Sequence, residues 1–106
     1  MTDRELLEIA AKAYGLQVKG WVGNKFNYYD PILDYAGFGD WNPLEDDGDA
    51  LRLAVKLFLT IGINDGFTEI LSERKGCTEP HSTTNSYTAT RRAIVRAAAE
   101  IGKDMK

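Results

Sequence analysis

The chain has 106 residues, of which 43% are hydrophobic and 27% charged, and its formal net charge is -3. This composition predicts one globular domain over residues 1–106 and argues against a nucleic-acid-binding protein, because such domains usually carry a basic patch. No apolar run reaches the roughly 20 residues of a transmembrane helix, and the N-terminus lacks the pattern of a signal peptide. A single cysteine excludes an intrachain disulfide, so a reducing cytoplasm is the expected compartment.

The N-terminal part predicts a helix followed by a β-hairpin. Apolar residues recur at helical spacing over residues 3–14, and Gly15 follows as a terminator. A strand over residues 17–22 and a second over 26–29 flank a Gly-Asn turn. An irregular loop with apolar anchors is expected over residues 31–42.

Aromatic residues of the hairpin and loop form a candidate protein-binding surface. On a regularly alternating strand, Trp21 lies on the face opposite Val18 and Val22, and it is exposed if the valines face the core. Exposed Trp and Tyr are typical of protein interfaces. The alternative, which weighs about equally, is that the loop folds over this face and buries it. The candidate partner-binding residues are Trp21, Phe26, Tyr28, Tyr29 and Tyr35.

The central segment predicts a helix that begins near residues 46–49 and ends at Gly62. Its polar residues form one narrow stripe, and the remaining positions are apolar, so the helix is expected to be mostly enclosed. The stripe consists of Asp49, Arg52, Lys56 and Thr60.

The C-terminal part predicts a strand near residues 66–72, a short strand within 77–85 and a last helix. Thr88 or Thr90 is the expected cap of this helix, and Gly102 its end. Small residues on its apolar face permit a close approach to a neighbouring helix. The predicted order α-β-β-α-β-β-α indicates an α/β protein of the α+β type, with three helices around a short sheet.

Two segments carry a family resemblance. WNPLEDDGDALRLAVKL at residues 41–57 and TRRAIVRAAAEIG at 90–102 are 17 and 13 residues long. Together they resemble the phage ABA-sandwich domain family, which consists of small proteins of tailed phages and prophages. The resemblance implies a three-layer helix–sheet–helix sandwich, a viral origin and a host bacterial cytoplasm as the setting. The family has no established activity, so the resemblance implies no catalytic residue.

An acidic turn precedes the central helix and has two interpretations. Five carboxylates within ten residues suit a hard cation, although their spacing is not that of an EF-hand. The stronger interpretation is that Asp46 or Asp47 caps the helix and the other acids complement its dipole. We therefore predict no metal site. The five residues are Asp40, Glu45, Asp46, Asp47 and Asp49.

A hydroxyl-rich segment opens the last helix and carries two arginines in its first turns. Because a helix dipole disfavours cations at this end, either an anion lies there or the arginines pair internally with the acids at 45–49. Internal pairing is the favoured interpretation. The candidate anion-binding residues of the alternative are Ser86, Thr88, Thr90, Arg91 and Arg92.

Neither His81 nor Cys77 has a catalytic partner that the sequence identifies, so we predict no enzyme activity and no cofactor. The sequence therefore predicts a phage accessory protein that binds a host or phage protein without catalysis. The alternative is a small-ligand protein that binds a nucleotide or phosphate, such as a sponge for a defence signal. No nucleic acid or membrane partner is expected, and self-association stays open.

Overall fold

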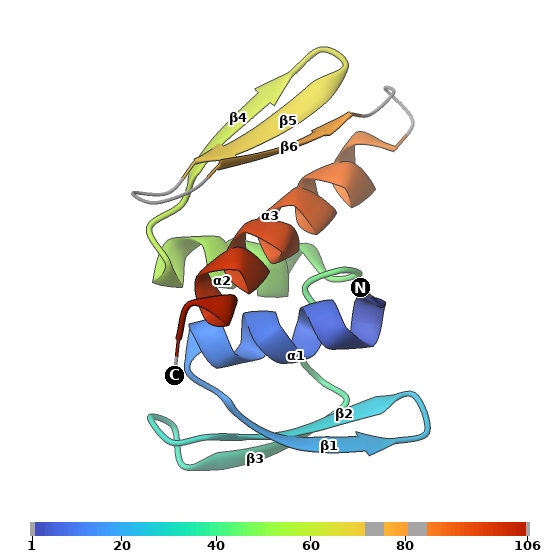
Figure 1. Ribbon diagram of the computed structural model, residues 1–106. Helices are drawn as coiled ribbons and strands as arrows, with labels where there is room; N and C mark the ends of the chain where they lie inside the picture. The colour runs from blue at the N-terminus through green and yellow to red at the C-terminus, as the bar shows by residue number, and fades with distance from the viewer. Residues whose placement is uncertain (1, 72–75, 81–84, 106) are drawn as a thin grey trace.

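The computed structural model describes residues 2–71, 76–80 and 85–105. In this part of the chain, three helices lie between two three-stranded antiparallel sheets, ordered β1-β2-β3 and β4-β5-β6 (Figure 1). The elements are α1 (Asp3–Tyr14), β1 (Gln17–Val22), β2 (Lys25–Asp30), β3 (Tyr35–Phe38), α2 (Asp47–Lys56), β4 (Thr60–Asn64), β5 (Phe67–Leu71), β6 (Gly76–Pro80) and α3 (Ser86–Lys103).

The α+β class is confirmed, and the layers differ from the expected helix–sheet–helix order. The first sheet packs beneath α1, and the second covers α3 (Figure 1). Each sheet is antiparallel and can bury one face while the other meets water. The helices therefore form the interior of the molecule, and the sheets form two of its outer faces.

The predicted first helix and hairpin are confirmed as α1, β1 and β2. Thr2 caps α1, because its hydroxyl accepts a hydrogen bond from the amide of Glu5 at 3.2 Å. Gly15 ends the helix with a φ of 106°, a conformation that glycine adopts without strain. The two strands then pair around the turn at residues 23–24.

A β-bulge in β1 overturns the predicted separation of Trp21 from Val18. The register shifts between Val18 and Gly20, so that Val18 lies opposite Tyr28 and Trp21 lies opposite Phe26. Trp21 thereby joins the face of the hairpin that packs into the core. Phe26 and Tyr28 are only 2% and 7% exposed, so their predicted place on an exposed binding surface is wrong.

The segment at 31–42 is not an irregular loop throughout, because residues 35–38 form β3 and pair with β2. Gly37 is essential to this pairing. A Cβ at Gly37 would lie 2.0 Å from a ring carbon of Tyr28, so the tyrosine ring occupies the space where a side chain would stand. The absence of a side chain at Gly37 lets Tyr28 cross β3.

The central helix is shorter and more exposed than predicted. α2 ends at Lys56, Phe58 adopts a positive φ of 54°, and Gly62 lies in β4 instead of ending the helix. Leu51 and Val55 are 60% and 66% exposed, because the second sheet covers α3 and leaves this face of α2 open. The prediction of an enclosed helix is therefore wrong.

The last helix begins at Ser86, earlier than predicted, so Thr88 and Thr90 lie inside its first turns. Gly102 belongs to its last turn instead of ending it. The predicted close approach is confirmed: buried alanines line the contact between α1 and α3. A Cβ at Gly102 would lie 2.3 Å from the carbonyl oxygen of Ile9 in α1.

Candidate functional site

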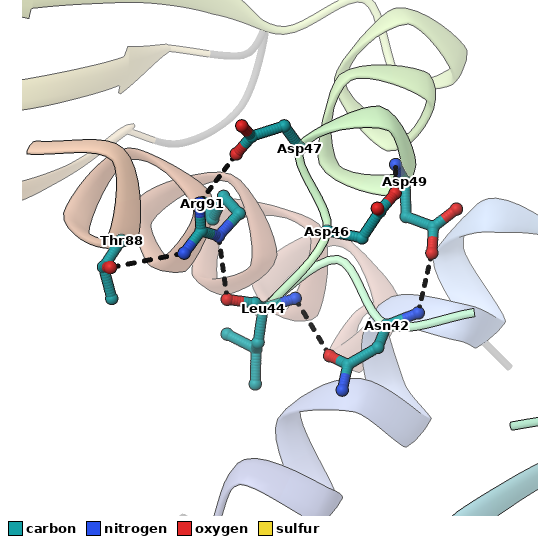
Figure 2. Close-up of polar contacts among 7 residues, drawn as sticks. All are labelled: Asn42, Leu44, Asp46, Asp47, Asp49, Thr88 and Arg91. Carbon is teal, nitrogen blue, oxygen red and sulfur yellow. Dashed lines mark hydrogen bonds and ion pairs between the residues drawn. The ribbon is translucent and has the colours of Figure 1, made fainter. Parts of the chain in front are cut away.

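Arg91 joins the start of α2 to α3 (Figure 2). Its Nε donates to the carbonyl oxygen of Leu44 at 3.0 Å, and its Nη1 to Asp47 at 2.7 Å. Its Nη2 donates to the hydroxyl of Thr88 at 3.2 Å. Because all three guanidinium nitrogens have protein partners, Arg91 acts as a structural clamp, and its predicted pairing with the acidic turn is confirmed.

Two other acids of this turn, Asp46 and Asp49, organise the helix start, as predicted. Asp46 is the N-cap and accepts from the amide of Asp49 at 2.8 Å. The Asp49 carboxylate accepts from the amide of Asn42 at 2.9 Å (Figure 2). It also pairs with Arg52 at 3.1 Å. These carboxylates are committed to hydrogen bonds within the turn.

Arg92 pairs elsewhere than predicted. Its Nη2 donates to both carboxylate oxygens of Asp3 in α1, at 3.1 and 3.3 Å. The partner is 89 residues away in the sequence, and the close packing of α1 on α3 brings it near. Arg92 therefore ties α3 to α1, and of the two arginines in the prediction Arg91 alone binds the acidic turn.

Asp40 lies apart from the acidic turn, among aromatic residues of the first sheet. It accepts hydrogen bonds from the Tyr35 hydroxyl and from the amide of Phe38 at 2.8 Å. The Tyr35 hydrogen bond is the main cause that lowers the pKa of Asp40. Burial, and then the charge of Asp40, raise the pKa of Tyr28 far above its usual value. In residues 2–71, 76–80 and 85–105, no three potential metal-ligating side chains come together.

The remaining aromatics do not form one exposed surface. Trp21 is half-buried: its indole nitrogen donates to Glu8 at 2.7 Å, and the Arg4 guanidinium lies 4.7 Å from its ring centroid. The Tyr29 hydroxyl bonds to Asp34, and Tyr35 is exposed. The predicted partner-binding residues are thus divided between core, hydrogen-bonded edge and surface.

An apolar groove of about 510 Å³ lies between α2, β4 and α3, and sequence reasoning did not find it. Leu51, Ile63 and Tyr87 lie along it with exposures of 60%, 65% and 75%. Ala50, Ile61 and Ile94 also line it, and Asp47 and Arg91 stand among the few polar groups. The unbroken apolar surface of α2 was the available signal, but it was interpreted as burial.

The predicted anion-binding residues divide between this groove and a second, polar pocket. Ser86, Thr90 and Arg91 line the groove, and the Thr90 hydroxyl is hydrogen-bonded to Thr68 at 2.9 Å. Thr88, Arg92 and again Arg91 line the polar pocket. The five residues therefore do not converge on one anion as predicted. Cys77 lies in β6, and His81 lies outside the described residues.

No protein-family model, curated protein or solved structure matches this chain. The resemblance to the phage ABA-sandwich domain family therefore stays a prediction. Across the described parts of the chain, none of the helices has the length and apolar character needed to cross a membrane.

Proposed function

We propose that the chain is a phage accessory protein that binds a host or phage protein without catalysis, and that the apolar groove is its binding surface. The observation that carries the proposal is the gathering of exposed apolar side chains from three elements, Leu51, Ile63 and Tyr87, around one groove. Contiguous exposed apolar surface marks interaction sites on folded proteins. The viral origin and the bacterial cytoplasm rest on the sequence resemblance alone.

The edge of β4 supports an extended polypeptide segment as the occupant. β4 is an edge strand, and its sequence TIGIN contains no charge and no proline. Natural edge strands are usually protected by such residues or by bulges. The edge strand β1 has Lys19 and a bulge, and the edge strand β6 has Glu79 and Pro80. The edge strand β3, with the sequence YAGF, likewise has no charge and no proline, so it is the adjoining apolar groove that sets β4 apart from β3.

A strand added to β4 would continue the second sheet over α2. Its backbone would pair with the strand edge, and its alternate side chains would meet the groove at Leu51 and Ile63. The sheet would then cover α2 as it now covers α3 (Figure 1). This mode of recognition would bury the apolar side chains that the free protein exposes.

Affinity capture from bacterial lysate with two matched variants tests the proposal. Ile63→Asp places a charge on the β4 edge, and Val22→Asp places the same charge on the β1 edge at a similarly exposed valine, 59% against 65%. We expect Ile63→Asp to lose the specific partner and Val22→Asp to retain it. If both variants capture the partner as well as the unmodified chain, the groove is not the binding surface.

Light scattering on the same proteins separates a foreign partner from self-association. If the free chain is a dimer that Ile63→Asp converts to a monomer, then the segment at β4 belongs to a second copy. That result would contradict a foreign partner at this edge.

A further inference from the structure

The polar pocket has a volume of about 520 Å³ and is formed by four parts of the chain. Its walls come from the start of α1, the β1–β2 hairpin, the segment before α2 and the first turns of α3. Arg91 is the one lining residue that it shares with the apolar groove. The remaining lining residues of the two cavities differ.

The side-chain amides of this pocket have a fixed orientation, because the oxygen of each one accepts a hydrogen bond. Asn42 Oδ1 accepts from the amide of Leu44 at 3.1 Å, and Asn24 Oδ1 accepts from Arg4 at 3.3 Å. Only an oxygen can accept from these donors, so the orientation of both side-chain amides is fixed. Figure 2 shows the Asn42 amide nitrogen turned away from the Leu44 amide. Each NH₂ group is left to bind something else.

The Thr88 hydroxyl follows the same pattern. Its oxygen accepts from Arg91 at 3.2 Å, and its O–H is a donor as well. Three side chains from separate parts of the fold, Asn24, Asn42 and Thr88, thus line one pocket with donors.

Two guanidinium groups add charged donors. Arg92 uses Nη2 on Asp3, and Arg4 uses Nη2 on Gly23 and Asn24. Within the described part of the chain, no hydrogen bond occupies the Nε and Nη1 groups of either arginine. The lining also holds the carboxylates of Asp3, which pairs with Arg92, and Glu45, and the guanidinium of Arg91, which is committed to Leu44, Asp47 and Thr88.

We infer that the polar pocket binds a phosphoryl group, either as free phosphate or on a small metabolite. Phosphate oxygens are acceptors only, and they form their strongest hydrogen bonds with guanidinium groups. The pocket volume lies within the ordinary range for small-molecule sites. Leu7 and Leu44 in its wall offer an apolar surface to the organic part of such a ligand. This ligand site goes beyond the proposed protein binding and does not depend on it.

Nuclear magnetic resonance titration with inorganic phosphate, and separately with adenosine monophosphate, tests the inference. We expect saturable shifts of the side-chain NH₂ signals of Asn24 and Asn42. Tighter binding of the nucleotide identifies a phosphorylated metabolite, and equal binding identifies the free anion. Absence of a saturable shift with both ligands at millimolar concentration overturns the proposal.

Asn42→Asp is the sharpest variant, because it keeps the acceptor for the Leu44 amide and replaces the donor with a negative charge. We expect the affinity for either ligand to fall at least about tenfold. Gln17→Glu makes the same amide-to-carboxylate change at an exposed position of β1 outside the pocket, and we expect it to leave the affinity unchanged. If Asn42→Asp fails to fold, Asn24→Asp in the hairpin turn provides a second measurement of ligand affinity. Unchanged affinity in a folded donor variant contradicts the inference.

Discussion

Gly102→Ala should destabilise the protein by separating α1 from α3. The new Cβ would lie 2.3 Å from the Ile9 carbonyl oxygen and 2.8 Å from Ile9 Cγ2. The oxygen belongs to helical backbone and cannot rotate away as a side chain does. The helices must therefore move apart by about 1 Å to restore van der Waals contact.

Two opposing contributions set the magnitude. Overpacking a core costs about 1–3 kcal/mol, and the backbone clash places Gly102 at the upper end. Alanine returns up to about 1 kcal/mol relative to glycine through its helix propensity. We expect a net loss of about 2 kcal/mol, which for a domain of this size lowers the melting temperature by about 10 °C.

Calorimetry on Gly102→Ala and Gly48→Ala measures this difference. Gly48 also lies in a helix, but its nearest neighbours are the side-chain atoms Arg52 Nη2 and Asp46 Oδ2 at 3.2 Å, which need to shift by only a few tenths of an ångström and can keep their hydrogen bonds to Asp49. Gly48→Ala should therefore be neutral or slightly stabilising. If Gly102→Ala is as stable as Gly48→Ala, the close approach of α1 and α3 is refuted.

Three further perturbations test other parts of the structure. Gly37→Ala sets its Cβ 2.0 Å from a tyrosine ring and should cost about 1–3 kcal/mol in urea unfolding; an unchanged midpoint contradicts the packing. Arg91→Lys loses the three-nitrogen clamp, chiefly the hydrogen bond to the Leu44 carbonyl oxygen, and should lower the free energy of unfolding by about 1–2 kcal/mol in the same assay. Unchanged stability would show that the clamp is dispensable. The Tyr35 hydrogen bond lowers the pKa of Asp40 below the ordinary value of 3.8. The ionised Asp40 therefore stabilises the fold above pH 3.8, and this stabilisation is lost as the pH falls through the folded-state pKa. The free energy of unfolding of Asp40→Asn, measured against pH, should lack this acid-sensitive contribution. A pH profile identical to that of the unmodified protein would contradict the role of Asp40.

The sequence predicted the elements whose signals are local. α1 follows from its helical spacing and its terminal glycine, and the first hairpin follows from the Gly-Asn turn. The cap at Asp46 and the pairing of Arg91 with the acidic turn were also predicted from charges near helix ends.

The parts that sequence missed depend on tertiary contacts. β3 contains Gly37, which weakens its strand signal, and the strand forms by pairing with β2, whose Tyr28 ring crosses it at Gly37. Apolar residues continue from α2 through Phe58, so the sequence did not reveal where the helix ends. Phe58 adopts a positive φ, which stops the helix from continuing. A bulge at one residue of β1 reversed the expected side of Trp21.

The candidate site was missed for a related reason. Sequence shows that Leu51 and Val55 are apolar but cannot show whether another element covers them. Their exposure follows from the packing of the second sheet on α3. The donor character of the polar pocket likewise depends on which oxygens of Asn24 and Asn42 are already bonded.

Hydrogen exchange of the captured complex tests the central claim most directly. If a partner segment adds to the edge of β4, backbone amides within Thr60–Asn64 gain protection in the complex, while those of the opposite edge strand β1, Gln17–Val22, do not change. Unchanged exchange in β4, or new protection confined to the first sheet, would contradict the proposed docking at the apolar groove.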